Sequence, residues 1–548
     1  MKKQKKASRR KTASKKTRKI IKPVSIGSGP VNPITPEPAS TSGKETLAQA
    51  VAALQAGRGQ EALKLCSQVL SSDPGDTEAL NLAGVAAFQT GDGAQGRELL
   101  ETALAFRPDF TDAHNNLGNV LEAQGLFVEA EASYRRCIAL NAGAVSAHFH
   151  LGNVLKALGR LSEAQEAYKR VLAITPDHAE ALNNTGAVDM ELGCAADAIH
   201  AYRKAIGRNP GFAEAHYNLG IALQKTGELD AALDSYRRAL SCDSGHAGAQ
   251  INIGYAYKEM GRLEEAEKAY RAAIRMAPDY DKVQVNLGDL YLQQGNPQAA
   301  VDVCDAYLAD HPGNISILAF KSIALTERSS VDNSFSLDEA HALYDFDRLL
   351  RPVRPACPEG FADMAEFNRA LSTHVLGHPS LSVQPTSHAT RSGRHSGELL
   401  IEPKGPVAAL ETVIMTAVDD FRTSVPTDAS HPWLGRRPDR MGLSVWGVAM
   451  DSQGHQLAHI HPSAWLSGVY YPKIPAVVRA DDPGHAGWIE FGRAPEDFHS
   501  STPPEVRLIR PEEGLMVLFP SYFYHRTVPF ESDEVRISIA FDVLDLDL

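Results

Sequence analysis

Histidines near the C-terminus are spaced so that they could bind a metal ion. His459 and His461 lie two residues apart in the segment GHQLAHIHPSAWLSGVYY. Residues at that spacing face the same side of a β-strand, so both imidazoles can point at one ion. His525 lies 64 residues further along, at the end of the strand-like segment FPSYFYHRTVP, and is a candidate ligand from a second strand. His455 precedes this pair and is expected to support the site from outside it.

A basic residue with a hydroxyl neighbour follows the distal histidine. Arg536 and Ser538 lie in VRISIAF, where they alternate with Ile537 and Ile539 and therefore share one face of a strand. A buried guanidinium can hold a carboxylate through two parallel hydrogen bonds. The pattern therefore indicates a pocket for a cosubstrate that carries carboxylates.

The order of these motifs, with the flanks SGVYY and LFPSYFYH, resembles the iron(II)/2-oxoglutarate dioxygenases, specifically the branch often fused to tetratricopeptide repeats. The resemblance covers about residues 330–548, and its specific motifs are confined to 455–541. It implies that Fe(II) and 2-oxoglutarate are the cofactors, and that His459 and His525 are iron ligands.

The resemblance also assigns the cosubstrate pocket. It implies that Arg536 anchors the distal carboxylate of 2-oxoglutarate and that Ser538 makes a second contact to that carboxylate. Tyr470, or its neighbour Tyr471, follows the first ligand on the next strand and is expected to line this pocket.

One position departs from the family pattern, because His461 stands where these enzymes have Asp or Glu. Three interpretations are open. His461 could be a third neutral ligand, it could turn away and leave two histidines with water, or the fold could be a relic that binds little metal. We favour His461 as a ligand.

A period of 34 residues dominates the chain before residue 329. One glycine series is Gly84, Gly118, Gly152, Gly186, Gly220, Gly254 and Gly288, and a second is Gly57, Gly91, Gly125, Gly159, Gly193, Gly227, Gly261 and Gly295. This spacing, with blocks such as AHNNLGNVLEAQGLFVEAEASYRRCIAL, resembles the tetratricopeptide repeat. We expect eight helix pairs and a closing helix at residues 315–328, which together form an array over 43–328.

A row of asparagines recurs with the same period. Its members are Asn116, Asn184, Asn218, Asn252 and Asn286. An amide can donate and accept hydrogen bonds at once, which suits the binding of a peptide main chain in a groove. The prediction is therefore a protein or peptide partner in the groove. The alternative is that these amides only cap neighbouring turns or bind water.

The remaining residues, 329–548, suffice for a separate domain. Helical patterns come first, and short β-rich runs separated by turn residues follow from about Gly442. The predicted fold class is α+β multidomain, an α-solenoid of tetratricopeptide repeats followed by a double-stranded β-helix (jelly-roll) domain.

The net charge of the chain is −12, but its N-terminus is strongly basic, since residues 1–22 hold twelve Lys and Arg and no acid. Residues 1–42 are expected to be a disordered tail and linker. The simplest interpretation is a solvated arm, and weak contact with nucleic acid or anionic lipid is the alternative. No secretory signal or transmembrane segment is expected, and six cysteines without C-x-x-C spacing indicate free thiols, so we expect a cytoplasmic protein.

These patterns favour an iron(II)/2-oxoglutarate-dependent oxygenase, a hydroxylase whose repeat array recruits a protein or peptide. Two alternatives stay open. The chain could be a non-catalytic repeat adaptor with a relic β domain, or a three-His metal enzyme of cupin type that needs no 2-oxoglutarate.

Overall fold

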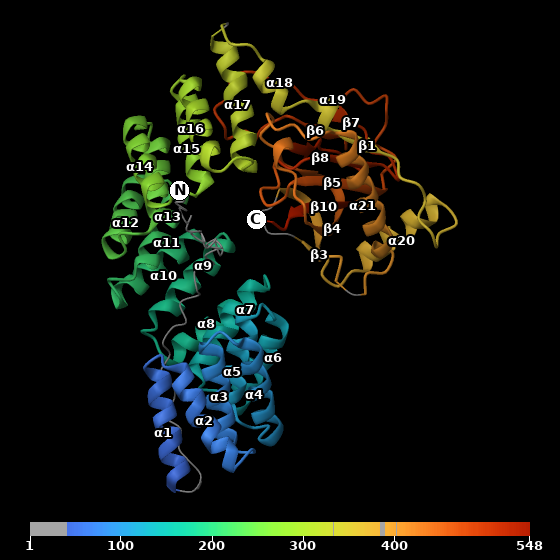
Figure 1. Cartoon of the computed structure of the whole chain (residues 1–548). Coiled ribbons are helices and arrows are strands. Elements are labelled where there is room, and N and C mark those ends of the chain that lie inside the picture. Colours follow the sequence, from blue (N-terminus) through green and yellow to red (C-terminus); the bar gives the residue numbers. More distant parts are fainter. Residues whose placement is uncertain (1–40, 333, 384–388, 402, 548) are drawn as a thin grey trace, which may run out of the picture. The chain divides into compact units, whose positions relative to one another are not determined.

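The computed structural model describes residues 41–332, 334–383, 389–401 and 403–547 (Figure 1). The chain forms two compact units, one that ends at Thr226 and one that begins at Gly227. The basic tail expected over residues 1–42 lies, up to residue 40, outside the described residues. No helix in the described ranges is long and apolar enough to cross a membrane.

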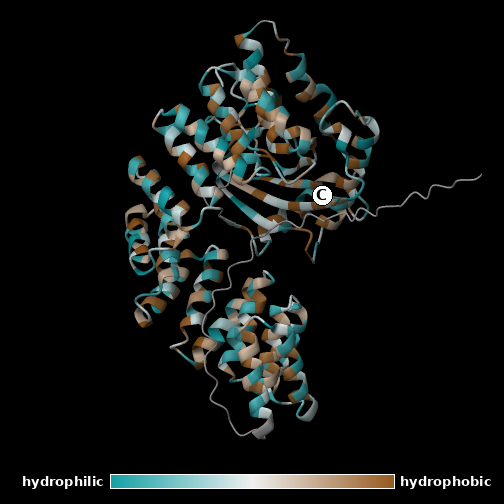
Figure 2. Cartoon of the chain, turned by 60° about the vertical axis from the view of Figure 1, so that its left-hand side comes forward, coloured by the Kyte–Doolittle hydropathy of each residue, from teal (hydrophilic) through white to brown (hydrophobic). Residues whose placement is uncertain are grey.

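The first unit consists of helices that pack in sequential pairs. They are α1 (Thr41–Gln55), α2 (Gly59–Ser72), α3 (Thr77–Gln89), α4 (Gly93–Phe106), α5 (Thr111–Ala123), α6 (Phe127–Leu140), α7 (Val145–Ala157), α8 (Leu161–Ile174), α9 (Ala179–Glu191), α10 (Ala195–Arg208) and α11 (Ala213–Lys225). Each helix mixes hydrophobic and hydrophilic residues along its length (Figure 2), which allows one face to pack while the other meets solvent. The predicted α-solenoid is confirmed.

The two glycine series have different physical roles, which the α7–α8 pair illustrates. Gly159 ends α7 with φ of 73°, a left-handed conformation that glycine adopts without steric cost. Gly152 lies where α7 crosses α8, because a Cβ added there would sit 2.5 Å from Cε1 of Tyr168. The first series therefore permits close helix packing, and the second ends the first helix of each pair.

The second unit begins with the last repeats. Their helices are α12 (Leu229–Cys242), α13 (Ala247–Glu259), α14 (Leu263–Met276), α15 (Asp281–Gln293), α16 (Pro297–Asp310) and α17 (Ile315–Val331). The closing helix predicted at residues 315–328 is thus α17, three residues longer than expected.

In its described residues the β domain contains two antiparallel sheets, four α-helices and a short 3-10 helix (Leu434–Arg436). Its helices are α18 (Asp338–Leu343), α19 (Phe346–Leu349), α20 (Met364–Gly377) and α21 (Val407–Ser424). The large sheet has the order β1 (Arg351–Val353), β8 (Met516–Pro520), β5 (Leu466–Lys473), β10 (Arg536–Asp545), β4 (Met441–Gln456), β3 (Thr390–Glu398) and β2 (Ser382–Val383). The small sheet has the order β7 (Arg507–Ile509), β6 (Ile489–Phe491) and β9 (His525–Thr527). This curled antiparallel domain after a solenoid confirms the α+β class.

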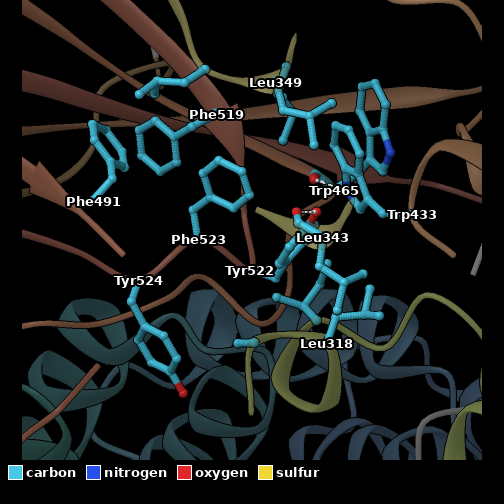
Figure 3. Close-up of a cluster of buried hydrophobic side chains, with 14 of the residues drawn as sticks. Leu318, Leu343, Leu349, Trp433, Trp465, Phe491, Phe519, Tyr522, Phe523 and Tyr524 are labelled. Atoms are coloured by element: carbon cyan, nitrogen blue, oxygen red, sulfur yellow. Dashed lines mark hydrogen bonds between the residues drawn. The ribbon is translucent and has the colours of Figure 1, made fainter. Parts of the chain in front are cut away.

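One hydrophobic core joins the closing helix α17 to the β domain (Figure 3). Leu318 of α17 belongs to the same cluster of buried residues as Leu343 and Phe523. The hydroxyl of Tyr522 donates a hydrogen bond to the Leu343 carbonyl at 2.6 Å, and Tyr344 stacks on Phe523 with ring centroids 4.7 Å apart. The last repeats and the β domain therefore share a core, which explains why the compact unit begins at Gly227.

A loop of the β domain, residues 498–502, docks on the inner helices of these repeats. Phe498 contacts Phe320 of α17, with ring centroids 5.5 Å apart. Asp289 of α15 is buried and accepts hydrogen bonds from the backbone N–H of His499 at 2.8 Å and from His499 Nδ1 at 3.0 Å. Asp289 also pairs with Lys258 of α13. This docked loop is thus held by charge as well as by aromatic contact.

Glu327 of α17 supplies the second anchor of the docked loop. Its carboxylate accepts hydrogen bonds from Ser500 Oγ at 2.6 Å, Ser501 Oγ at 2.9 Å and the backbone N–H of Thr502 at 2.6 Å. Burial would raise the pKa of Glu327, but these hydrogen bonds outweigh it and hold the pKa below its ordinary value. The ionised carboxylate therefore contributes to loop docking.

Replacing Glu327 by glutamine is expected to destabilise the second unit by about 1–3 kcal/mol, because the new amide N–H₂ faces hydrogen-bond donors. Differential scanning calorimetry of the full chain should show a lower melting temperature. The matched control is Glu339→Gln, whose carboxylate is 63% exposed in its pair with Arg328 and should contribute little. Equal melting temperatures for the two variants would contradict the anchoring role.

Candidate metal centre

Three histidines from two segments of the β domain meet at one point. The backbones of His459 and His525 hydrogen-bond each other in both directions, at 3.1 Å. The backbone N–H of His461 donates to the carbonyl of Ser521, also at 3.1 Å. The ring centroids lie 4.2 Å apart for His459 and His525, 5.1 Å for His461 and His525, and 5.2 Å for the H-x-H pair. The structure thus brings the three sequence-predicted histidines together.

The size of this histidine cluster suits one ion. One potential ligand atom of each histidine lies within 4.8 Å of the others, and no other group of this kind occurs among the described residues. Two nitrogens on opposite sides of one ion would be about 4.2 Å apart at metal–nitrogen distances of about 2.1 Å. The limit of 4.8 Å is therefore close to the largest nitrogen–nitrogen separation that one ion allows.

Hydrogen bonds at Nδ1 orient all three rings. His459 Nδ1 lies 2.8 Å from the Leu457 carbonyl, and His525 Nδ1 lies 3.1 Å from the Phe523 carbonyl. Because a carbonyl oxygen only accepts, each Nδ1 must carry the proton. The lone pair is then on Nε2, which is the arrangement that metal-binding histidines adopt.

The surroundings keep two of these imidazoles neutral. Burial, reinforced by the neighbouring His461, lowers the pKa of His459 to about 3. Burial, together with the neighbouring His459 and His461, lowers the pKa of His525 well below its ordinary value. Neutral imidazole is the form that binds metal, so protons compete weakly at these two positions near neutral pH.

These pKa shifts predict acid sensitivity of the metal-free protein. Imidazoles with an ordinary pKa of about 6.5 take up protons in the unfolded chain before they do so in the folded one. Stability should therefore fall as the pH drops below about 6.5, continuing toward the folded-state pKa of about 3 for His459. Thermal unfolding of chelator-treated protein between pH 7 and 5 tests this. The double variant His459→Asn/His525→Asn should lose stability less steeply, and an equal slope would contradict the prediction.

The third histidine has a different partner. His461 Nδ1 lies 2.6 Å from Oδ1 of Asp542, and both side chains are largely buried. Asp542 is on β10, where it pairs in register with Ser444 of β4 and Ser467 of β5. Ser467 Oγ donates to the same carboxylate oxygen at 2.7 Å. His461 is thus the one member of the histidine cluster that is oriented by a carboxylate.

Arg536 and Ser538 begin β10 and project from the same sheet face as Asp542, because even-numbered steps along a strand preserve the face. Both are buried, at 2% and 3% exposure. Arg536 Nη1 donates to the Gly487 carbonyl at 2.8 Å, while its Nε has no hydrogen-bond partner among the described residues. No carboxylate within those residues pairs with this guanidinium, and burial lowers its pKa although the neighbouring Tyr471 opposes the shift. The geometry fits an external carboxylate.

Tyr470 lies on the other face of the sheet, away from Arg536. Its hydroxyl donates to Asn368 Oδ1 of α20 at 2.6 Å. Tyr471 lies beside Arg536 instead, with the guanidinium carbon 5.2 Å from the tyrosine ring centroid. The placement of Tyr470 therefore corrects the expectation that it lines the pocket. The pairing of β5 with β10 shifts register between Ile537 and Ile539, which sequence alternation does not reveal.

Aromatic rings form the apolar wall beside the histidine cluster. Phe519 and Phe491 lie 4.6 and 6.1 Å from the His525 ring, and Trp446 lies 5.6 Å from the His461 ring, measured between centroids. Such a wall limits water around the site.

Sequence reasoning missed His395. It pairs in register with Val448 of β4, which pairs with Ser538 of β10, so all three share the sheet face of the site. His395 also lies close enough to His459 that its charge would lower the pKa of His459. No motif marks His395, because only the register between β3 and β4 brings it there.

The asparagine row of the repeats uses part of its hydrogen-bonding capacity internally. The residues Asn116, Asn184, Asn218, Asn252 and Asn286 are all half-buried. Three of them donate from Nδ2 to an asparagine of the preceding repeat, in the pairs Asn116–Asn81 (2.9 Å), Asn184–Asn153 (2.9 Å) and Asn218–Asn183 (3.1 Å). These bonds tie neighbouring repeats together and leave each Nδ2 one further N–H donor, while the Asn184 oxygen also accepts from Asn183 Nδ2 at 3.3 Å.

Comparisons with known proteins agree with this architecture. Residues 444–542 match the family described as "Putative 2OG-Fe(II) oxygenase", and tetratricopeptide repeat families match residues 53–119, 109–177, 188–247 and 251–315. The chain therefore carries tetratricopeptide repeats followed by a region that matches this oxygenase family. These matches confirm the resemblance noted in the sequence.

Several solved structures are similar to part of the chain. The crystal structure of MamA is 25% identical over 29% of this chain and 94% of its own, with a TM-score of 0.28. The structure of YrrB, described as a TPR protein with an unusual peptide-binding site, is 24% identical over 34% of this chain and 96% of its own, with a TM-score of 0.30. No curated protein matches the chain.

Proposed function

We propose that this protein is an iron(II)/2-oxoglutarate-dependent oxygenase that hydroxylates a protein or peptide recruited by its repeat array. One observation carries the proposal. No carboxylate of the described residues pairs with the buried Arg536, which lies on the sheet face where Asp542 orients a histidine of the histidine cluster. An unpaired buried guanidinium is costly, so its presence favours a ligand that supplies the missing carboxylate.

Each residue of the site has a role in this proposal. Hydroxylation coupled to conversion of 2-oxoglutarate to succinate and CO₂ is the chemistry that iron(II) with O₂ supplies when bound. His459, His461 and His525 would hold the metal through Nε2 and leave the other coordination positions open. Arg536 and Ser538 would hold the distal carboxylate of 2-oxoglutarate. The apolar wall of Trp446, Phe491 and Phe519 excludes water.

The proposal for the repeat array rests on its asparagine row. Each amide that bridges two repeats keeps a further N–H donor, and an amide can both donate to and accept from the backbone of an extended peptide. The fold class alone favours protein partners, and the chemistry of the row favours a main chain rather than a particular side chain. The substrate would then be a protein or peptide.

The cysteines support a reducing compartment for this protein. None of the six forms a disulfide within the described residues; Cys66, Cys137 and Cys304 are buried, and Cys194, Cys242 and Cys357 are exposed. Disulfides are rare where thiols are kept reduced, as in the cytoplasm. We therefore propose a cytoplasmic location.

Calorimetric titration of the full-length, metal-loaded protein with 2-oxoglutarate tests the proposed function. Manganese(II) replaces iron(II) in the titration to avoid oxidation, and succinate formation is then measured with iron(II), 2-oxoglutarate and O₂. The expected result is one 2-oxoglutarate per metal and succinate release that requires iron(II). Metal binding without 2-oxoglutarate binding would favour the cupin-type enzyme, and binding of neither would leave the non-catalytic adaptor.

A further inference from the structure

The oxygenases that this chain resembles have a carboxylate ligand at the position of His461. In this chain a carboxylate instead contacts the His461 ring on the side of Nδ1. Asp542 Oδ1 is 2.6 Å from His461 Nδ1, and the two side chains are 15% and 12% exposed. The other two histidines of the cluster make the equivalent bond to backbone carbonyls, of Leu457 and Phe523. His461, which stands in place of the acidic ligand, is therefore the histidine of the cluster whose Nδ1 is hydrogen-bonded to a carboxylate.

The Asp542 carboxylate is fixed in place from several sides. Ser467 Oγ donates to Oδ1 at 2.7 Å and lies 2.8 Å from Ser521 Oγ. The Ser521 carbonyl in turn accepts the backbone N–H of His461 at 3.1 Å. Asp542 lies on β10, which is paired on both sides, and its one ion-pair partner among the described residues is His461. This network closes a ring around the His461–Asp542 pair.

We infer that Asp542 is a positioning residue that acts through His461. Through its hydrogen bond to His461 it compensates for the carboxylate ligand that position 461 lacks. Its acceptor oxygen fixes the proton on Nδ1 and leaves the Nε2 lone pair facing the metal. Its negative charge also makes His461 a stronger donor, which offsets part of the positive charge of a metal held by three neutral ligands. The inference rests on the proposed metal site and adds a residue outside the ligand set.

The first test compares metal affinity of the full-length protein and its Asp542→Asn variant. Cobalt(II) is the probe, because its visible absorption reports both binding and ligand geometry, and no catalytic assay is needed. Loss of an outer partner of this kind weakens metal binding by about 10–100-fold. The control is Asp545→Asn, the same substitution on the same strand, which should leave cobalt affinity unchanged. Equal affinity for wild type and Asp542→Asn would overturn the inference while leaving the proposed metal site intact.

A second pair of variants separates the inferred role from a merely structural one. His461→Asp moves the carboxylate into the ligand position, so Asp542 is no longer needed to supply its charge. In that background Asp542→Asn should change cobalt affinity by less than threefold. A tenfold or greater loss in the double variant would overturn the inference, even if Asp542→Asn alone does not fold. Failure of the wild-type protein to bind cobalt would instead overturn the proposed metal site, and this inference with it.

Discussion

Replacing His525 by alanine is expected to weaken metal binding by about a hundredfold or more. Structural zinc sites with four ligands bind with about 10–16 kcal/mol, which corresponds to roughly 3 kcal/mol for each ligand. His525 is the most buried member of the histidine cluster, and its backbone pairs with that of His459. Alanine keeps this backbone pairing and removes only the imidazole, so the fold should persist while the site opens.

Metal content after reconstitution and dialysis, measured by atomic emission, checks this expectation. His200→Ala, an exposed histidine on α10, is the control and should retain the metal of the wild type. A His525→Ala protein that retains stoichiometric metal would show that the ion is held elsewhere.

Replacing Arg536 by methionine is expected to weaken 2-oxoglutarate binding by at least a hundredfold without weakening metal binding. Breaking a buried ion pair by removal of one partner costs about 3–5 kcal/mol, because the other charge remains buried and unpaired. Methionine has a similar length and no charge. Without 2-oxoglutarate, Arg536→Met should be at least as stable as the wild type, because the guanidinium is buried at 2% exposure without a carboxylate partner in the described residues.

Three measurements together distinguish this role from simple damage to the domain. Calorimetry gives the 2-oxoglutarate affinity, cobalt absorption gives the metal affinity, and thermal unfolding gives the stability without cosubstrate. Arg536→Lys keeps the charge but loses the planar fork, so its 2-oxoglutarate affinity should fall between those of methionine and arginine. Unchanged 2-oxoglutarate affinity in Arg536→Met would refute the assignment of this anchor.

The sequence predicted those features that depend on local spacing. The 34-residue period predicted the repeat helices, and alternation along a strand placed Arg536 with Ser538. His459 and His461 meet as their spacing predicts, although they lie between β4 and β5 and not on a strand. The histidine cluster itself needed a third residue from another strand, and the family resemblance supplied it. The repeat helices and the residue pairs on one strand could be predicted because their residues recur at short, regular distances in the chain.

The features that sequence reasoning missed depend on long-range strand register. Tyr470 and Tyr471 are equally plausible by composition, and an irregularity between β5 and β10 decides which one faces Arg536. His395 and Asp542 reach the site only because β3, β4 and β10 pair in one particular register. A shift of one residue in either pairing would turn these side chains to the opposite face.

The contacts of the docked loop, residues 498–502, restrict where the chain can be divided into separate fragments. The change from repeats to β domain near residue 329 looks like the joint between two interchangeable modules. A fragment starting there would lose Asp289 and Glu327, and with them the acceptors for the donors of His499, Ser500, Ser501 and Thr502. It would also expose Phe498 and the part of the core covered by α17. The compact unit that contains all of these contacts begins at Gly227, so the last repeats belong with the β domain rather than with the first repeats.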